Sequence, residues 1–137
     1  MTPDITSGRL PRDDVAARAL VVENDLTSRE LLARVLRLKG LDAHTAIGAA
    51  QAAALLLDSA TPYDLLIVDL NLEPVDGIEL LRHVAVLPTN RRPRRIVAIS
   101  ESLAPFYPRL SELQMELEMF QKPVHLPSLM KIVEALG

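Results

Sequence analysis

Four groups of residues able to take part in chemistry each follow a short apolar run in this sequence. In chain order they are Glu23-Asn24-Asp25, Asp69, Ser100 and Lys122-Pro123. A carboxylate can act as a nucleophile or as an oxygen ligand of a hard cation, and an ammonium group can pair with an anion. Each group alone is more often a solvated strand end than part of a site. Four such groups favour a shared site, with Asp69 as the candidate reactive acid.

The elements that must position these groups alternate along the chain between strands and helices. The expected strands are 18–22, 41–46, 64–69, 94–100 and 117–121, and the expected helices are 27–40, 48–59, 76–87, 103–115 and 126–136. The first helix is expected to open with a capping box from Thr27 to Glu30. Continuous apolar strands alternating with helices are typical of a parallel sheet covered on both faces. Ligands of such sheets bind outside the carboxyl ends of the strands, where all four groups stand.

Composition excludes several classes of function. The chain has 137 residues, of which 49% are hydrophobic and 24% charged, which predicts one globular domain at 18–137 after a loosely ordered arm at 1–17. A net charge of -3 with two Phe, two Tyr and no Trp argues against nucleic acid as a partner. The basic stretch 90–95 is expected to be a solvated loop, with docking on an acidic partner as the alternative. No cysteine, signal-peptide core or membrane-length apolar run occurs, so we expect a cytoplasmic protein without a membrane partner.

The order and spacing of four short motifs resemble those of a known family. The motifs are LVVEN with Glu23, LIVDLNL…DG with Asp69, Asn71 and Gly77, IVAIS with Ser100, and FQKP with Lys122-Pro123. They make the chain from about 18 to 136 similar to the receiver domain of two-component response regulators. The resemblance implies a flavodoxin-like, doubly wound (βα)5 sandwich of α/β class, whose five-stranded parallel sheet has the order 2-1-3-4-5. It also implies a cis peptide bond between Lys122 and Pro123.

The resemblance further implies phosphoryl transfer from a histidine kinase or a phosphotransfer protein onto Asp69, followed by hydrolysis through an autophosphatase activity. Lys122 would pair with one phosphoryl oxygen, and the Ser100 hydroxyl would donate to another. The implied cofactor is Mg²⁺, and its implied ligands are Glu23, Asn24, Asp69 and the backbone carbonyl of Asn71. Since the chain ends after the fifth helix, we expect a stand-alone receiver that signals to a downstream protein target. The face between the fourth and fifth helices is a candidate surface for a homodimer.

Several residues depart from the family pattern and keep a second hypothesis open. Asn24 stands where the family usually has a carboxylate, and Asp25 is expected to turn to the other face of the strand. One unit charge at about 4 Å in an effective dielectric near 20 is worth roughly 4 kcal/mol per partner charge, so weak Mg²⁺ binding is expected. Glu101 replaces a small residue, Met119 replaces an aromatic one, and two prolines interrupt 103–115. The alternative is a pseudo-receiver, an interaction module with weak or no Mg²⁺-dependent phosphorylation.

Overall fold

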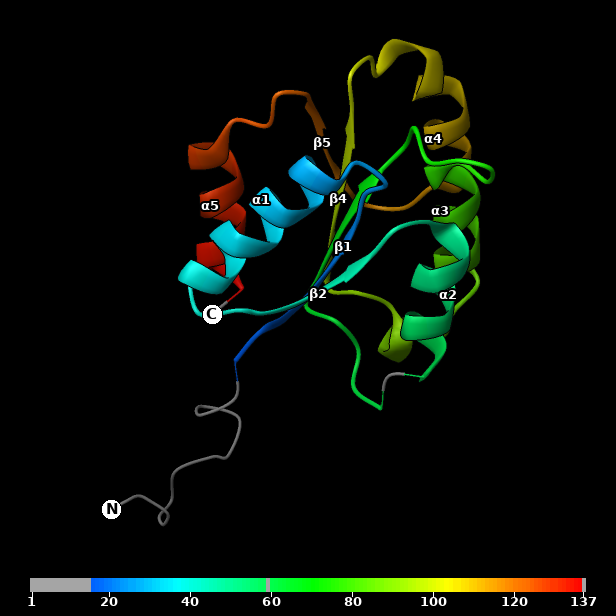
Figure 1. Ribbon diagram of the computed structural model, residues 1–137. Coiled ribbons are helices and arrows are strands. Elements are labelled where there is room, and N and C mark those ends of the chain that lie inside the picture. Colours follow the sequence, from blue (N-terminus) through cyan, green and yellow to red (C-terminus); the bar gives the residue numbers. More distant parts are fainter. Residues whose placement is uncertain (1–15, 59, 137) are drawn as a thin grey trace, which may run out of the picture.

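Strands and helices alternate along the chain in a computed structural model, which describes residues 16–58 and 60–136 (Figure 1). The strands are β1 (Arg18–Val22), β2 (Asp42–Ala46), β3 (Leu65–Asp69), β4 (Arg95–Ser100) and β5 (Glu118–Gln121). The helices are α1 (Leu26–Leu38), α2 (Ala49–Asp58), α3 (Gly77–Ala85), α4 (Tyr107–Leu113) and α5 (Leu126–Ala135), with 3₁₀ turns at Thr89–Arg91 and Ala104–Phe106. The expected arm lies almost wholly outside the described residues. No helix in the described part combines the length and the apolarity needed to cross a bilayer.

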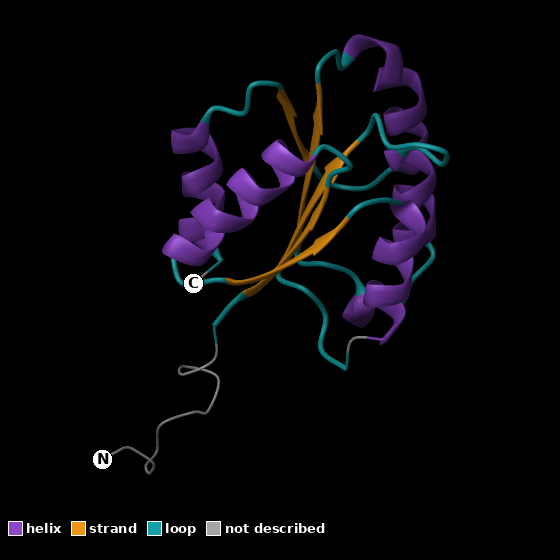
Figure 2. Ribbon diagram, in the orientation of Figure 1, coloured by secondary structure: helices purple, strands orange, loops and turns teal. Residues whose placement is uncertain are grey.

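The strands form one parallel sheet in the order β2-β1-β3-β4-β5. Helices α1 and α5 cover one face of the sheet, and α2, α3 and α4 cover the other (Figures 1 and 2). The predicted fold class and strand order are therefore confirmed. Because β3 is central and covered on both faces, all five of its residues are buried, which explains why its sequence lacks polar alternation.

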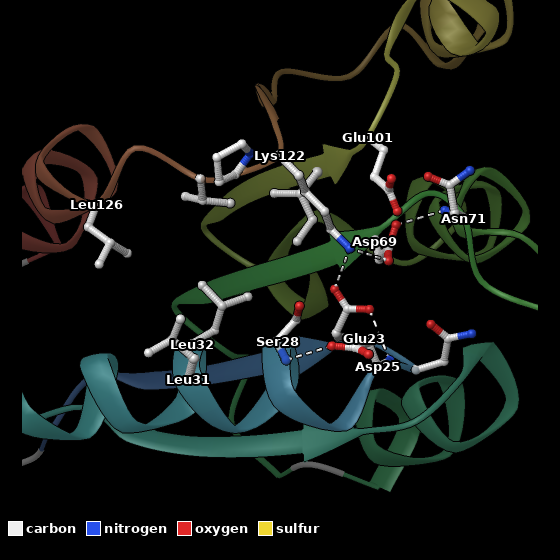
Figure 3. A pocket seen from close by; sticks show the side chains of 14 residues that line it. Glu23, Asp25, Ser28, Leu31, Leu32, Asp69, Asn71, Glu101, Lys122 and Leu126 are labelled. Atoms are coloured by element: carbon white, nitrogen blue, oxygen red, sulfur yellow. Dashed lines mark hydrogen bonds and ion pairs between the residues drawn. The ribbon is translucent and has the colours of Figure 1, made fainter.

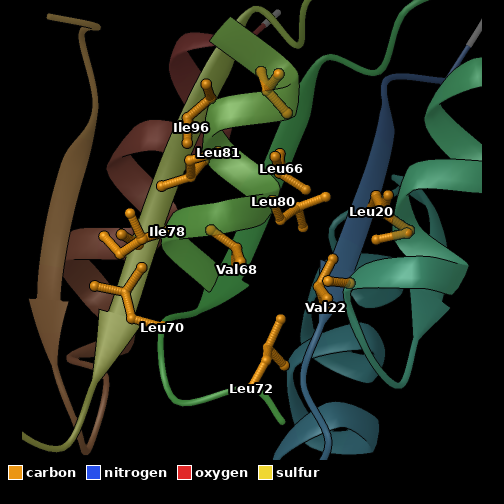
Figure 4. Packing of buried hydrophobic residues seen from close by; sticks show 14 of the residues in the cluster. Leu20, Val22, Leu66, Val68, Leu70, Leu72, Ile78, Leu80, Leu81 and Ile96 are labelled. Carbon is orange, nitrogen blue, oxygen red and sulfur yellow. The ribbon is translucent and has the colours of Figure 1, made fainter. Parts of the chain in front are cut away.

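Two hydrophobic cores lie on the two faces of the sheet, and alternate residues of each strand enter them. Leu66 and Val68 of β3 pack with Leu81 and other residues of α2 and α3, as Figure 4 shows. Leu65 and Ile67 point the other way, into the core that α1 and α5 complete. With both faces held by apolar contact, the backbone of β3 is fixed and the residue at its end has a defined position.

The start of α1 differs from the prediction made from the sequence. The N-cap of α1 is Asp25, whose carboxylate accepts a hydrogen bond from the Ser28 backbone N–H at 2.8 Å. The predicted capping box from Thr27 is wrong, because the helix begins one residue earlier and Thr27 lies inside its first turn. The hydrogen bonds from Ser28 lower the pKa of the Asp25 carboxyl. Asp25 therefore acts as the N-cap of α1.

The fourth helical segment is interrupted and short, in agreement with its two prolines. The predicted range 103–115 contains a 3₁₀ turn that includes Pro105, then the seven-residue α4, which has Pro108 in its first turn. A proline lacks the N–H needed inside a helix, so both prolines are tolerated only near element starts. The helix ends at Gln114, whose φ of 51° is left-handed.

The basic stretch 90–95 leads from the end of α3 into the start of β4. All four of its arginine side chains have partners within the chain. Arg91 donates to the Leu57 carbonyl, Arg92 to the Leu87 and Ala85 carbonyls, Arg94 pairs with Asp64, and Arg95 pairs with Glu118. The Arg92 contacts satisfy carbonyls left open at the end of α3. Apart from Pro93 the stretch is partly or fully exposed, as expected of a solvated loop, and its arginines also contact neighbouring segments.

Candidate functional site at the carboxyl edge of the sheet

Residues that are far apart in the sequence meet where β1, β3, β4 and β5 end. Glu23 follows β1, Asp69 and Ser100 end β3 and β4, and Lys122 follows β5. In the described part of the chain, the only polar or charged residues that are buried are Glu23, Asp69 and Ser100. Burying a polar group is costly unless it has hydrogen-bond partners. The burial of three such groups where the strands end therefore identifies a candidate functional site.

Lys122 lies between the two buried carboxylates. Its Nζ donates to Glu23 Oε2 at 2.8 Å and to Asp69 Oδ2 at 2.9 Å (Figure 3). Burial raises the pKa of Glu23, while the hydrogen bond from Lys122 acts in the opposite direction without cancelling the rise. Burial lowers the pKa of Lys122, but the bonds to Glu23 and Asp69 outweigh it and leave that pKa raised. Lys122 is therefore a cation throughout the neutral range and offsets one of the two negative charges.

Backbone and side-chain donors from nearby residues fix the rest of the acid pair. The Asn71 backbone N–H donates to Asp69 Oδ1 at 2.9 Å, and the Asp25 N–H donates to Glu23 Oε1 at 3.1 Å. Arg29 of α1 donates to the Glu23 carbonyl at 2.9 Å and holds the loop after β1. Every oxygen of the two carboxylates thus has a donor, and each keeps further acceptor capacity. The carboxylates are oriented before any ligand arrives.

Ser100 is buried at the end of β4, next to Asn71. Its Oγ lies 2.6 Å from Asn71 Oδ1 and 2.9 Å from the Ser102 carbonyl, and the Ser102 N–H donates to it at 3.2 Å. Ser100 does not line the cavity in which Asp69 and Lys122 lie. The structure brings the predicted hydroxyl to the site but directs it at Asn71.

A cavity of about 720 Å³ opens onto this edge. Its polar part contains Glu23, Asn24, Asp69, Glu101 and Lys122 (Figure 3). Its apolar part lies between α1 and the segment after β5, and is lined by Leu31, Leu32, Val124 and Leu126. The volume lies in the range of ligand pockets, which makes this cavity a candidate binding site.

The groups around Asp69 that could act as metal ligands are of the type that a hard cation such as Mg²⁺ prefers. All are oxygens: the Glu23 and Asp69 carboxylates, the Asn24 amide and the backbone carbonyl of Asn71. Over residues 16–58 and 60–136, no three Asp, Glu, His or Cys side chains converge as a metal-binding group. The residues therefore fit Mg²⁺ by donor chemistry, with little negative charge to hold it.

Gly77 and Asp76 determine where α3 begins after the loop that follows Asp69. A Cβ on Gly77 would lie 2.5 Å from the Asp69 carbonyl oxygen and 2.8 Å from Leu70 Cα, so α3 begins directly against the end of β3. Asp76 caps α3 through the Glu79 N–H at 3.1 Å. Burial raises the pKa of Asp76, but its bonds to Arg109 and to the Glu79 N–H outweigh this effect and lower it.

Some of these features were outside the reach of sequence reasoning. Arg109 pairs with Asp76 through Nη1 at 2.9 Å, and no local pattern connects residues 33 positions apart. The Lys122–Pro123 bond is cis, which confirms the prediction, but a second cis bond at Glu73–Pro74 was not predicted. The capping role of Asp76 had a sequence signal, an aspartate directly before a helical pattern.

Comparisons with known proteins agree with this geometry. The response regulator receiver domain family matches residues 19–134. The search of curated proteins found no match. Among solved structures, the CheY-like receiver domain from Methylobacillus flagellatus has a TM-score of 0.76 at 24% identity, with 90% of this chain and 100% of that chain covered. A response regulator receiver protein from Pseudomonas putida has a TM-score of 0.75 at 26% identity, covering 88% and 98%. A CheY-like receiver domain from Methanospirillum hungatei JF-1 has a TM-score of 0.77 at 20% identity, covering 89% and 94%. With the family matched over most of its length, this chain belongs to the response regulator receiver domain family.

Proposed function

We propose that this receiver domain accepts a phosphoryl group on Asp69. The observation that carries the proposal is the pairing of Asp69, 2% exposed, with the Lys122 ammonium at 2.9 Å. A carboxylate oxygen of Asp69 attacks phosphorus while the bond from phosphorus to the donor's nitrogen breaks, and that nitrogen keeps the electron pair. The product is an acyl phosphate, which water later hydrolyses.

The residues around Asp69 act mainly by position and charge, as phosphoryl transfer requires. Lys122 offsets the negative charge of the phosphoryl oxygens, and the Asn71 N–H keeps the carboxylate oriented. Mg²⁺, when held by Glu23, Asn24, Asp69 and the Asn71 carbonyl, supplies further positive charge to the same oxygens. Glu23 also anchors Lys122 at 2.8 Å.

The apolar part of the cavity supports a protein as the phosphodonor. Leu31 is 53% exposed on α1, beside a wall formed by Val124 and Leu126. An apolar surface next to a reactive carboxylate suits a histidine kinase or phosphotransfer protein, which must bring its phosphohistidine to Asp69. A downstream protein target, a homodimer and a cytoplasmic location stay predictions from the sequence.

Intact-mass measurement tests the proposal directly. Incubation with acetyl phosphate and Mg²⁺ is expected to add one phosphoryl group to the wild type and none to Asp69→Ala, because that variant lacks the nucleophile. Asp64→Asn is a matched control that leaves Asp69 in place, since Asp64 lies at the opposite edge of the sheet. Absence of the adduct in the wild type, also with its kinase, would contradict the proposal.

The pseudo-receiver hypothesis is the second candidate, and the charge of the site favours it. Lys122 already offsets one of the two buried negative charges, and Asn24 adds none. A domain of this kind would bind its protein partner without phosphorylation. This hypothesis predicts weak Mg²⁺-dependent phosphorylation of the wild type or none.

Asn24→Asp is expected to tighten Mg²⁺ binding by about 10- to 100-fold, because it adds one negative charge near the cation. Asn24 lines the cavity, so the new carboxylate faces the site. Titration calorimetry measures the change, with Asn90→Asp as a control that adds the same charge at the amino edge of the sheet. Equal Mg²⁺ affinity in the two variants would show that Asn24 is not at the metal position.

A further inference from the structure

Asn71 contacts both the phosphoacceptor and the buried hydroxyl of the site. Its backbone N–H donates to Asp69 Oδ1 at 2.9 Å, and its side-chain Oδ1 lies 2.6 Å from Ser100 Oγ. Ser100 in turn accepts from the Ser102 N–H at 3.2 Å. A continuous chain of hydrogen bonds therefore runs from Asp69 through Asn71 and Ser100 to the loop after β4.

We propose that the Asn71 side chain is a positioning residue that holds the Ser100 hydroxyl away from Asp69 until a phosphoryl group draws it over. The inference rests on the proposed function, since it concerns how the same site responds to phosphorylation. It gives the Asn71 side chain a role that is separate from that of its backbone carbonyl.

Competition between two acceptors follows from the chemistry of a hydroxyl. Ser100 Oγ carries one proton and can donate to one acceptor at a time. With Asn71 in place the Ser100 side chain is 0% exposed, so water does not compete for its proton. In the free protein Ser100 donates to Asn71 at 2.6 Å or to the Ser102 carbonyl at 2.9 Å, and a bond to a phosphoryl oxygen has to replace these. The bond to Asn71, the shorter of the two, opposes that change.

Movement of the Ser100 side chain would affect the loop that follows β4. The Ser102 N–H and carbonyl both lie within hydrogen-bond distance of Ser100 Oγ, so a shift of this oxygen breaks contacts that hold the loop. The 3₁₀ turn Ala104–Phe106 and α4 follow this loop directly. Asn71 thus sets how readily the loop after β4 responds to a phosphoryl group on Asp69.

The test compares four proteins: the wild type, Asn71→Ala, Ser100→Ala and the double variant. The first measurement is the amide resonance of Ser102 in the free protein by NMR. The second is the dissociation constant for fluoroberyllate, a phosphoryl analogue, at saturating Mg²⁺ by ¹⁹F NMR. Asn71→Ala should shift the Ser102 resonance and tighten fluoroberyllate binding about fivefold, the usual effect of one hydrogen bond. In the Ser100→Ala background, Asn71→Ala should leave the dissociation constant unchanged.

Two results would overturn the inference. One is a Ser102 resonance that does not move in Asn71→Ala, which would show that Asn71 does not hold Ser100. The other is a change in fluoroberyllate affinity that is the same with and without the Ser100 hydroxyl. If Asn71→Ala shifts the Ser102 resonance but no protein binds fluoroberyllate, the link from Asn71 to Ser100 is supported and phosphoryl acceptance fails.

Discussion

Lys122→Met is expected to lower the free energy of unfolding at pH 7 by about 3–5 kcal/mol, as removal of one partner of a buried ion pair does. Glu23 is 0% exposed and Asp69 2%, so neither carboxylate can replace the lost ammonium with bulk water. Methionine keeps the length of the side chain and its apolar contacts, and so isolates the charge. Urea unfolding followed by circular dichroism measures the change.

The pH dependence of this variant gives a second signature. Burial and the nearby Asp69 carboxylate raise the pKa of Glu23, and loss of Lys122 removes the hydrogen bond that opposes them. A carboxyl whose pKa is higher in the folded than in the unfolded state binds protons more readily when folded. The stability of Lys122→Met should therefore rise as the pH falls from 7 through the raised pKa.

Two further variants complete the comparison. Lys131→Met replaces an exposed lysine of α5 and should change stability little. Glu23→Gln in the Lys122→Met background should recover part of the loss, because only one carboxylate is then left without a cation. Equal losses in Lys122→Met and Lys131→Met would contradict the role assigned to Lys122.

Gly77→Ala is expected to destabilise the protein by about 3 kcal/mol or more, the upper range for forcing extra atoms into a packed interior. Helix propensity alone gives the opposite sign, since alanine is favoured over glycine by about 1 kcal/mol within a helix. The close approach decides the outcome, because the added Cβ would lie 2.5 Å from the Asp69 carbonyl oxygen and 2.8 Å from Leu70 Cα. Both are backbone atoms of the sheet and the loop after it, and they cannot rotate away.

The matched control is Gly48→Ala, whose Cβ would meet only the Glu73 carbonyl oxygen at 3.9 Å, an ordinary contact. Urea unfolding should show Gly48→Ala close to the wild type and Gly77→Ala far below it. The phosphorylation rate of Gly77→Ala should also fall, since the shift moves Asp69. If both variants are as stable as the wild type, α3 can move away from β3 without cost.

The sequence was sufficient to predict the helices and strands, and to predict that the site lies where the carboxyl ends of the strands meet. Continuous apolar runs such as 65–68 identify strands covered on both faces, and a parallel sheet then gathers their carboxyl ends. The Lys122 and Glu23 side chains are 99 positions apart, yet this argument brings them to one edge. The family resemblance supplied the strand order.

Individual contacts were beyond prediction because they depend on distances that only packing sets. The position of Asn71 was predicted through its carbonyl, but its side chain contacts Ser100, 29 residues away. The capping residue of α1 was misplaced, since Asp25 and Thr27 both suit an N-cap and the exit of β1 decides between them. The sequence of 90–95 did not indicate that Arg91 and Arg92 bond carbonyl groups at the ends of α2 and α3.

The parallel connections of this sheet also determine an electric field. Each strand that ends at the Asp69 edge is followed by a helix that begins there, and a helix amino terminus carries about half a positive charge. Asp25 and Asp76 offset this charge at α1 and α3 by capping them. The amino terminus of α5 has no side-chain cap, and it lies four residues after Lys122. The short link after Lys122 therefore brings an ammonium group and an uncapped helix start to one cavity, which Lys122 and Leu126 both line.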